Sequence, residues 1–596
     1  MSSNGYQNII LLLLCTLLFS CGQVNKIETI DFSISSPKQG WIYYEDTRIM
    51  LAVNVNTANI TWTSDISGFL GAGNHLSIYL TQGLHRIKAE IEGISKELTV
   101  YVAPNNSTVH TVLLNYTPME VKMKSGNCYA YLYTHNGTVD NFKVLPLQSS
   151  FGVISPNCSA NAKEAQNMPL RDLRLPMPEL SLALSGAFGE ANKSSDHLMQ
   201  RNFSESSYSV SSYEIGDKRS FFVINTKNQM GQPHNIKAEL LYYSDTLSVW
   251  VSVDAALAAN VLDECVQTVE TLIIPRVKAL WGKAADIDND GRLTLLFSPT
   301  LNNEKVLGFF NPSDFFLRNE DIMSKSYNPS SNEIDIIYVA LPEENPKSDF
   351  SLASINATIA HEMTHAATFT AKTWNRINSG DLNAKREELF LDEGWSHLTE
   401  NLCGLGISGG NIEFVKRFFE NTSLYSFCGA NSSGQEDSVG MRGAISLFLS
   451  WLFWEAGGIA YDSGDPVKLI DHGGISFLKK MLSSGQTGWE SIGLAYGKAT
   501  GQLFNEFLNE MHNYRLSSSV YNYKIDPFTK EAVDFFVNMG ESIGLGFPKT
   551  SSVSNALSLL PWSFVFMDQF SLQNETLLPL DAGGVSGSTF FSCSFK

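Results

Sequence analysis

The first part of the chain alternates apolar and polar residues over short stretches. Between residues 27 and 103 the alternation is interrupted by the turn-forming stretches "SPKQG", "SDISG" and "LTQGLH". A two-residue period between such turns is typical of half-buried β-strands. We therefore predict a β-sandwich over residues 21–104. The alternation continues beyond it, which predicts a second small β-unit over residues 105–160.

The later part of the chain changes in character several times. Residues 161–205 are rich in Pro, Ser and Asn, which favours a linker. The apolar run "GAISLFLSWLFWEAGG" (residues 443–458) is too short to cross a membrane and predicts a buried helix. The stretch "LLPWSFVFMDQF" indicates that the extension over residues 521–596 returns to β-structure.

Two histidines lie in the stretch "IAHEMTHAATF" (residues 359–369), which has a helical pattern. The apolar stripe of the predicted helix, which begins before this stretch, is formed by Ile355, Ile359, Met363 and Ala366. His361 and His365 are one helical turn apart and lie roughly 200° from this stripe, at about 100° per residue. Because both imidazoles share one helix face, they can bind one metal ion.

A second predicted helix offers further ligands. Catalytic zinc sites usually have three protein ligands and keep a fourth position for water. In "ELFLDEGWSHLTENLCG" (residues 388–404), Glu393, His397 and Glu400 have the spacing i, i+4 and i+7. A helix ending at Gly404 would present all three on one face toward the histidines.

On these residues the sequence resembles the gluzincin metallopeptidases, in which a glutamate from a later helix completes a His-Glu-x-x-His zinc site. The resemblance implies zinc on His361, His365 and Glu393. Glu393-Gly394-Trp395-Ser396 is similar to the pattern of hyicolysin-like enzymes, as are four upstream segments: "IGDKRSFFV", "DIDNDGRLTLLF", "GFFNPSDFF" and "SNEIDIIYVAL". It implies a thermolysin-like α+β domain over residues 206–520. The N-terminal sandwich, around Trp62, resembles bacterial Ig-like modules, so the chain is expected to be multidomain.

The resemblance also implies roles for the neighbouring polar residues. Glu362 is expected to be the general base that takes a proton from the attacking water. Glu400 is expected to accept the N–H of a zinc-bound histidine. His397 either supports the site in this indirect way or competes as a ligand. The strand "EIDIIYVAL" (residues 333–341) is a candidate for pairing with an extended substrate.

The function expected on this basis is an exported zinc-dependent endopeptidase that acts on proteins or peptides. Two alternatives stay open: a catalytically silent, metallopeptidase-like surface adhesin or binding protein, and an aminopeptidase. Gluzincins usually stabilise the oxyanion with a Tyr or His, but no Tyr occurs in "VGMRGA" (residues 439–444), where one is expected. The candidates for this role are Tyr425, Arg442, Tyr461 and His472.

The stretch "DIDNDG" (residues 286–291) resembles the opening of a calcium loop. Asp286, Asp288 and Asp290 would bring alternate carboxylates to one hard cation. The twelfth position of such a loop, where a bidentate Glu is expected, is Phe297. A calcium site and a plain Asp-rich turn are therefore both open.

Charge and the N-terminal residues bear on location. A net charge of -19 argues against nucleic-acid binding, which needs a basic surface. The apolar run ending in Leu18-Phe19-Ser20-Cys21 resembles a bacterial lipoprotein signal, which predicts a signal peptide over residues 1–20 and a lipid on Cys21. The chain is then expected to be anchored to the membrane at the cell envelope or cell surface, with secretion as the alternative. Nothing in the sequence indicates an oligomeric state.

Export would allow disulfides among the six cysteines that follow Cys21. Their spacing does not fit a thiolate metal site. Proximity in sequence favours the pairs Cys128–Cys158 and Cys403–Cys428, although six cysteines allow fifteen pairings.

Overall fold

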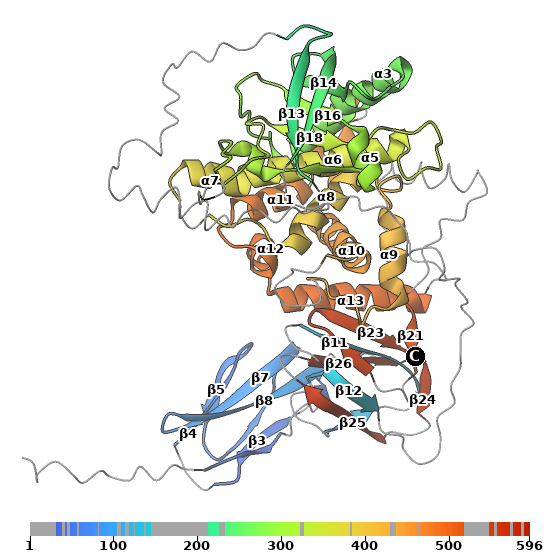
Figure 1. Ribbon diagram of the computed structural model, residues 1–596. Coiled ribbons are helices and arrows are strands. Elements are labelled where there is room, and N and C mark those ends of the chain that lie inside the picture. The colour runs from blue at the N-terminus through green and yellow to red at the C-terminus, as the bar shows by residue number, and fades with distance from the viewer. Residues whose placement is uncertain are drawn as a thin grey trace, which may run out of the picture.

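The computed structural model in Figure 1 describes residues 31–144, 213–517 and 548–595, apart from short gaps within these ranges. The predicted signal peptide with Cys21, the predicted linker over residues 161–205, and Cys158 lie outside the described residues. Within the described ranges, no helix combines the length and the apolar character that crossing a bilayer requires.

Two sheets in the N-terminal part share one apolar core. Their strand orders are β1-β3-β6 and β2-β8-β7-β4-β5. The strands are β1 (Ile34–Ser36), β2 (Ile42–Tyr44), β3 (Ile49–Val53), β4 (Ile60–Ser64), β5 (Gly68–Ala72), β6 (His75–Ile78), β7 (Gly83–Ile91) and β8 (Ile94–Ala103). Alternate residues of β7 are buried, and they pack with the fully buried Trp62. The Ig-like identity of this unit stays a prediction.

A second β-unit is built from segments near both ends of the chain. Its sheets have the orders β10-β25-β12-β22 and β21-β23-β11-β26-β9, with β24 pairing β11. The strands are β9 (Val109–Leu113), β10 (Met119–Met123), β11 (Gly126–Thr134), β12 (Val139–Val144), β21 (Thr550–Ser551), β22 (Leu557–Leu559), β23 (Ser563–Met567), β24 (Phe570–Leu572), β25 (Thr576–Val585) and β26 (Thr589–Phe595). The prediction of two separate units over residues 105–160 and 521–596 is therefore wrong. Strands of one segment alternate with strands of the other in the same sheets.

The disulfide of this unit joins the same two segments. Cys128 on β11 is bonded to Cys593 on the adjacent strand β26, with a Cα–Cα distance of 6.4 Å. The predicted pairs Cys128–Cys158 and Cys403–Cys428 are therefore wrong. Proximity along the sequence does not reflect the pairing of strands 465 residues apart. Cys403 and Cys428 remain buried thiols.

The middle of the chain contains a mixed six-stranded sheet with the order β13-β14-β15-β16-β18-β17. Its strands are β13 (Lys218–Val223), β14 (His234–Tyr243), β15 (Leu247–Ser252), β16 (Leu293–Phe297), β17 (Gly308–Phe310) and β18 (Ile336–Val339). β15, β16 and β18 are parallel, whereas β17 runs antiparallel to β18. The strand proposed for substrate pairing, β18, is thus internal, and β17 is the edge strand beside it.

Helices lie between the later strands of this sheet and after it in the chain, and they pack on the sheet and on one another (Figure 1). They are α3 (Ala259–Thr268), α4 (Ile274–Trp281), α5 (Pro299–Glu304), α6 (Leu352–Phe369), α7 (Asn375–Asn378), α8 (Leu389–Leu402), α9 (Asn411–Glu420), α10 (Val439–Glu455), α11 (Gly474–Ser483), α12 (Gly488–Tyr496) and α13 (Thr500–Ser517). The hairpin β19 (Ile459–Asp462) and β20 (Asp465–Asp471) follows α10. Helix α10 is buried along nearly all of its length, as its apolar sequence predicts.

Aromatic side chains join the second β-unit to the helices. Helix α13 lies between them in Figure 1. Trp562 stacks on Trp489 of α12 at a centroid distance of 3.9 Å and on His135 at 5.2 Å. Trp489 also contacts Phe390 of α8 at 5.3 Å. The β-unit and the helix that carries Glu393 therefore belong to one continuous core.

Candidate metal centre

The two helices of the site are placed by local interactions that their sequences explain. Helix α6 begins at Leu352. Ser351 caps its N-terminus, because the Ser351 side chain accepts a hydrogen bond from the Ser354 N–H. Helix α8 packs against α6 and α10. A Cβ at Gly394 would lie 2.5 Å from a methyl group of Leu449 in α10, so glycine permits this close approach. Gly394, the residue after Glu393, thus allows α8 to pack closely against α10 while α8 also packs against α6.

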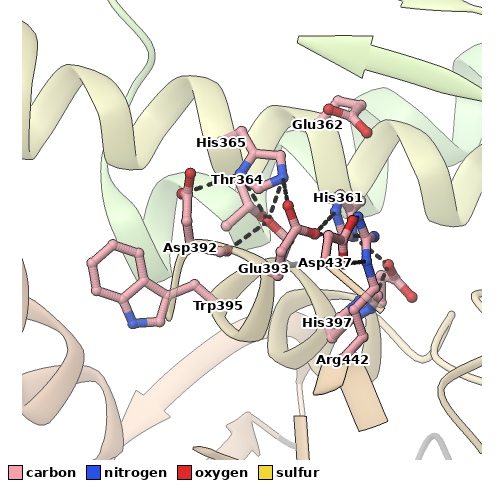
Figure 2. Close-up of polar contacts among 12 residues, drawn as sticks. His361, Glu362, Thr364, His365, Asp392, Glu393, Trp395, His397, Asp437 and Arg442 are labelled. Atoms are coloured by element: carbon pink, nitrogen blue, oxygen red, sulfur yellow. Dashed lines mark hydrogen bonds and ion pairs between the residues drawn. The ribbon is translucent and has the colours of Figure 1, made fainter. Parts of the chain in front are cut away.

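Figure 2 shows the two histidines of α6 facing Glu393 of α8. The Nε2 atom of His361 lies 3.2 Å from Glu393 Oε2, and the Nε2 atom of His365 lies 3.7 Å from Glu393 Oε1. One ligand atom from each of the three residues lies within 4.8 Å of the others. His361, His365 and Glu393 are 2%, 5% and 1% exposed, so these atoms converge inside the protein.

The other ring nitrogen of each histidine contacts a carboxylate. His361 Nδ1 lies 2.6 Å from Glu400 Oε1, and His365 Nδ1 lies 3.1 Å from Asp392 Oδ1. A carboxylate at Nδ1 favours the proton there and leaves the Nε2 lone pair for a metal. The sequence predicts the contact of Glu400 but not that of Asp392. The sequence feature that could have indicated Asp392 is its position: it is an acidic residue directly before Glu393, about 100° from it around the helix.

These donors fit zinc in type and number. Two imidazole nitrogens with one carboxylate are a common ligand set of catalytic zinc, which keeps a further position for water or substrate. The carboxylates behind the imidazoles are the partners that metal-binding histidines usually have. His361, His365 and Glu393 would therefore hold the ion.

Glu362, expected to be the base, lies on α6 between the two histidines but reaches a different partner. Its Oε2 accepts a hydrogen bond of 2.8 Å from the backbone N–H of Phe310, the last residue of edge strand β17. One helical step turns its carboxylate away from the side on which the histidines meet Glu393. The base is thus held between the sheet edge and the site.

His397 lies on the Nδ1 side of His361. Its own Nδ1 is 3.3 Å from Glu400 Oε1, and its ring packs on those of His361 and Phe414. Burial lowers the pKa of His397 to about 4. Burial alone would raise the pKa of Glu400, but its contacts with His397 and His361 lower it to about 2. His361, His397 and Glu400 also form a compact donor group, so the competing-ligand role stays open.

The four candidates for the oxyanion role lie in different surroundings. The guanidinium of Arg442 reaches Glu393, with NH1 3.0 Å from Oε2. The ring of Tyr461 lies under the guanidinium of Arg276, at 5.0 Å. Tyr425 packs against Gly440 at the start of α10, and His472 is exposed. Among the contacts described for these four residues, the contact of Arg442 is the one made to a predicted metal ligand.

The three aspartates before β16 do come together. One carboxylate oxygen from each of Asp286, Asp288 and Asp290 lies within 4.8 Å of the others. Asp286 accepts a hydrogen bond from the Gly291 N–H and Asp290 one from the Arg292 N–H, as in an Asp-rich turn. Burial, followed by the charges of Asp290 and Asp286, raises the pKa of Asp288 to about 6. Calcium binding here stays a prediction.

Two helices that present two imidazoles, a carboxylate and an adjacent glutamate beside a sheet edge define a candidate zinc hydrolase site. No family model matches the chain. Among curated proteins, the neutral metalloprotease ShpI of Staphylococcus hyicus is 22% identical over 273 residues, which cover 44% of this chain and 56% of the relative. The chain thus spans about half the length of the curated relative it matches. This distant similarity supports a metallopeptidase without indicating a subfamily.

Proposed function

We propose that the chain is a zinc-dependent endopeptidase with Glu362 as its general base. The observation that carries the proposal is the convergence of His361 Nε2 and His365 Nε2 on the Glu393 carboxylate, with Glu362 on the same helix. The partial similarity to a neutral metalloprotease supports the same class of activity. The narrower hyicolysin-like and gluzincin assignments are part of this proposal.

The mechanism assigns separate tasks to the residues around the ligands. Zinc, when bound, supplies a Lewis acid that polarises the scissile carbonyl and lowers the pKa of water. Glu362 takes the proton from the attacking water on its carboxylate and delivers it to the leaving nitrogen. The Phe310 N–H orients that carboxylate. Asp392 and Glu400 hold the two imidazoles in the tautomer that a metal needs.

The edge strand suggests how a peptide would lie. β17 is the last strand of the sheet, and its Phe310 N–H reaches the base. A substrate extended along this edge would pair with backbone groups of β17 other than the Phe310 N–H, which is engaged by Glu362, and would place a peptide bond beside the base. Recognition through the backbone needs no free terminus, which favours an endopeptidase over an aminopeptidase.

A peptide-library digest tests the proposal. The purified protein should cleave peptides, lose activity with a zinc chelator and regain it when zinc is added back. Peptides with blocked N-termini should be cleaved equally well. Loss of activity on blocked peptides would support the aminopeptidase instead. No cleavage by zinc-loaded protein would favour the silent adhesin or binding protein.

We further propose that the protein is exported and carries a lipid on Cys21. The support is the apolar run that ends in Leu18-Phe19-Ser20-Cys21. Growth with labelled palmitate should tag the protein, and Cys21→Ala should remove the tag and release the chain from membranes. Labelling that survives this substitution would contradict the lipid anchor.

A further inference from the structure

Arg442 is an arginine almost enclosed in the metal centre. It lies in the first turn of α10, which begins after Ser438, and it is 5% exposed. NH1 contacts Glu393 Oε2 at 3.0 Å. Nε and NH2 contact the two oxygens of Asp437 at 2.8 and 2.6 Å. Figure 2 shows Arg442 held between the two acids.

The charges around the two helices explain why a cation is needed there. Four carboxylates are almost fully buried: Glu362, Asp392, Glu393 and Glu400. Taking such charges out of water is costly unless they are paired. Arg386 NH2 lies 3.5 Å from Asp392 Oδ2, and Arg442 lies against Glu393. With neutral imidazoles, these two guanidinium groups and one divalent ion would balance the four buried carboxylates, while Asp437, the fifth acid, is exposed to solvent.

The contacts of Arg442 distinguish a positioning role from an oxyanion role. One edge of its guanidinium lies on Asp437 and the NH1 corner lies on Glu393, so each of its three nitrogen atoms contacts a carboxylate. The fork on Asp437 fixes the orientation of the guanidinium more strongly than a single point charge would be fixed. The fixed guanidinium then presents NH1 to Glu393, the carboxylate that faces both histidines.

We propose that Arg442, clamped by Asp437, is a positioning residue that orients the Glu393 carboxylate toward the two imidazoles. This inference rests on the proposed function, since it gives Arg442 a task only if Glu393 binds zinc. It replaces the oxyanion role that the sequence suggests for this residue.

The first test compares zinc affinity, measured by competition with a chromogenic chelator, in the wild type and Arg442→Gln. We expect a roughly 10- to 100-fold weaker affinity, as for other groups that orient a ligand. Arg442→Lys keeps the charge but loses the fork, so its affinity should be intermediate. The matched control is Arg417→Gln, because Arg417 pairs with Glu420 on α9 outside the site and its removal should leave the affinity unchanged.

Two further readouts separate positioning from a general structural effect. The visible absorption spectrum of the cobalt-substituted protein should shift in Arg442→Gln and stay unchanged in Arg417→Gln. In the Glu393→Ala background, Arg442→Gln should change the remaining two-histidine affinity by less than about twofold, because effects exerted through one shared partner are not additive. If Arg442→Gln does not fold, the same comparisons are made with Arg442→Lys and Asp437→Asn.

The outcomes distinguish this inference from the proposed function. A wild-type protein that binds zinc and cleaves peptides, beside a folded Arg442→Gln with the same zinc affinity and cobalt spectrum, would overturn the positioning role and leave the peptidase intact. A wild-type protein that binds no zinc would overturn both. Weaker zinc binding with an altered cobalt spectrum supports the positioning role.

Discussion

His397 is the residue whose role the geometry leaves most open, because it contacts Glu400 and packs on His361. If it supports His361 through Glu400, His397→Ala should retain one zinc per chain with an affinity about 10- to 100-fold lower. Metal analysis combined with chelator competition measures both quantities. A variant that binds no zinc would instead show that His397 is a ligand.

The aspartates before β16 give a second prediction for single residues. If calcium binds there, a calcium-selective chelator should lower the melting temperature while zinc stays bound, since a ligand of the folded state stabilises it. Asp288→Asn should remove that response, because Asp288 is one of the three converging carboxylates. Equal melting temperatures with and without the chelator would identify a plain turn.

For the metal centre, helix periodicity predicts much of what single residues do. His361, His365, Glu393 and Glu400 are found from their spacing because residues one or two turns apart share a face. Asp392 lies one step beside that face and so escapes the pattern, although it contacts His365. The contact of Arg442 depends on how α10 packs against α8, which no local pattern contains.

Among the elements, strand β17 is held in place by the turn that follows it. Asp314 in this turn is fully buried and accepts hydrogen bonds from the Tyr338 hydroxyl on β18 and from the Asn332 N–H. Burial raises the pKa of Asp314 to about 7, despite these donors. The position of the edge strand beside Glu362 thus depends on a buried carboxyl group.

This shift makes the free energy of unfolding depend on pH. Between pH 4 and 7 the folded state binds a proton on Asp314 that the unfolded state does not. The stabilisation of the folded state by this proton is therefore fully present below pH 4 and is lost as the pH rises toward 7. Asp314→Asn should remove a pH-dependent term on the order of a few kcal/mol. Urea unfolding of both proteins at several pH values measures it, and parallel curves would contradict the assignment.

The sequence predicts the long elements better than the short ones. The segments that become α6, α8 and α10 show their pattern over several turns, whereas β17 has three residues and no readable period. The substrate strand is therefore assigned to the longer apolar segment that becomes β18. Pairing on both sides of β18 is a tertiary property that alternation along one strand cannot reveal.

For the whole molecule, the β-unit built from both chain segments predicts the effect of truncation. Removing residues 548–596 would take away the partners of β9–β12 and the Trp562 side chain that stacks on Trp489. We expect this truncated protein to lose the cooperative thermal transition of the core that contains Trp489, followed by near-ultraviolet circular dichroism, whereas the N-terminal unit keeps its own core. A transition at the wild-type temperature would show that the segment is an independent appendage.

The matched control for the truncation is full-length Cys593→Ser. It keeps every strand and loses only the disulfide with Cys128. It should fold with a free energy of unfolding lower by about 2–5 kcal/mol. The sequence predicts β-structure in both segments, but not that they combine, because partners so far apart in the chain leave no local signal.

The central claim is that Glu362 acts on water without holding the metal. Glu362→Gln keeps size and removes basicity, so it should retain wild-type zinc content and melting temperature while peptide hydrolysis falls by at least ~10². His361→Ala and Glu393→Ala should contain no zinc as purified and should lose activity, because removing one of three ligands leaves only a weak affinity. Metal analysis with a fluorogenic endopeptidase assay on the purified variants measures this, and full activity in Glu362→Gln would contradict the zinc-peptidase account.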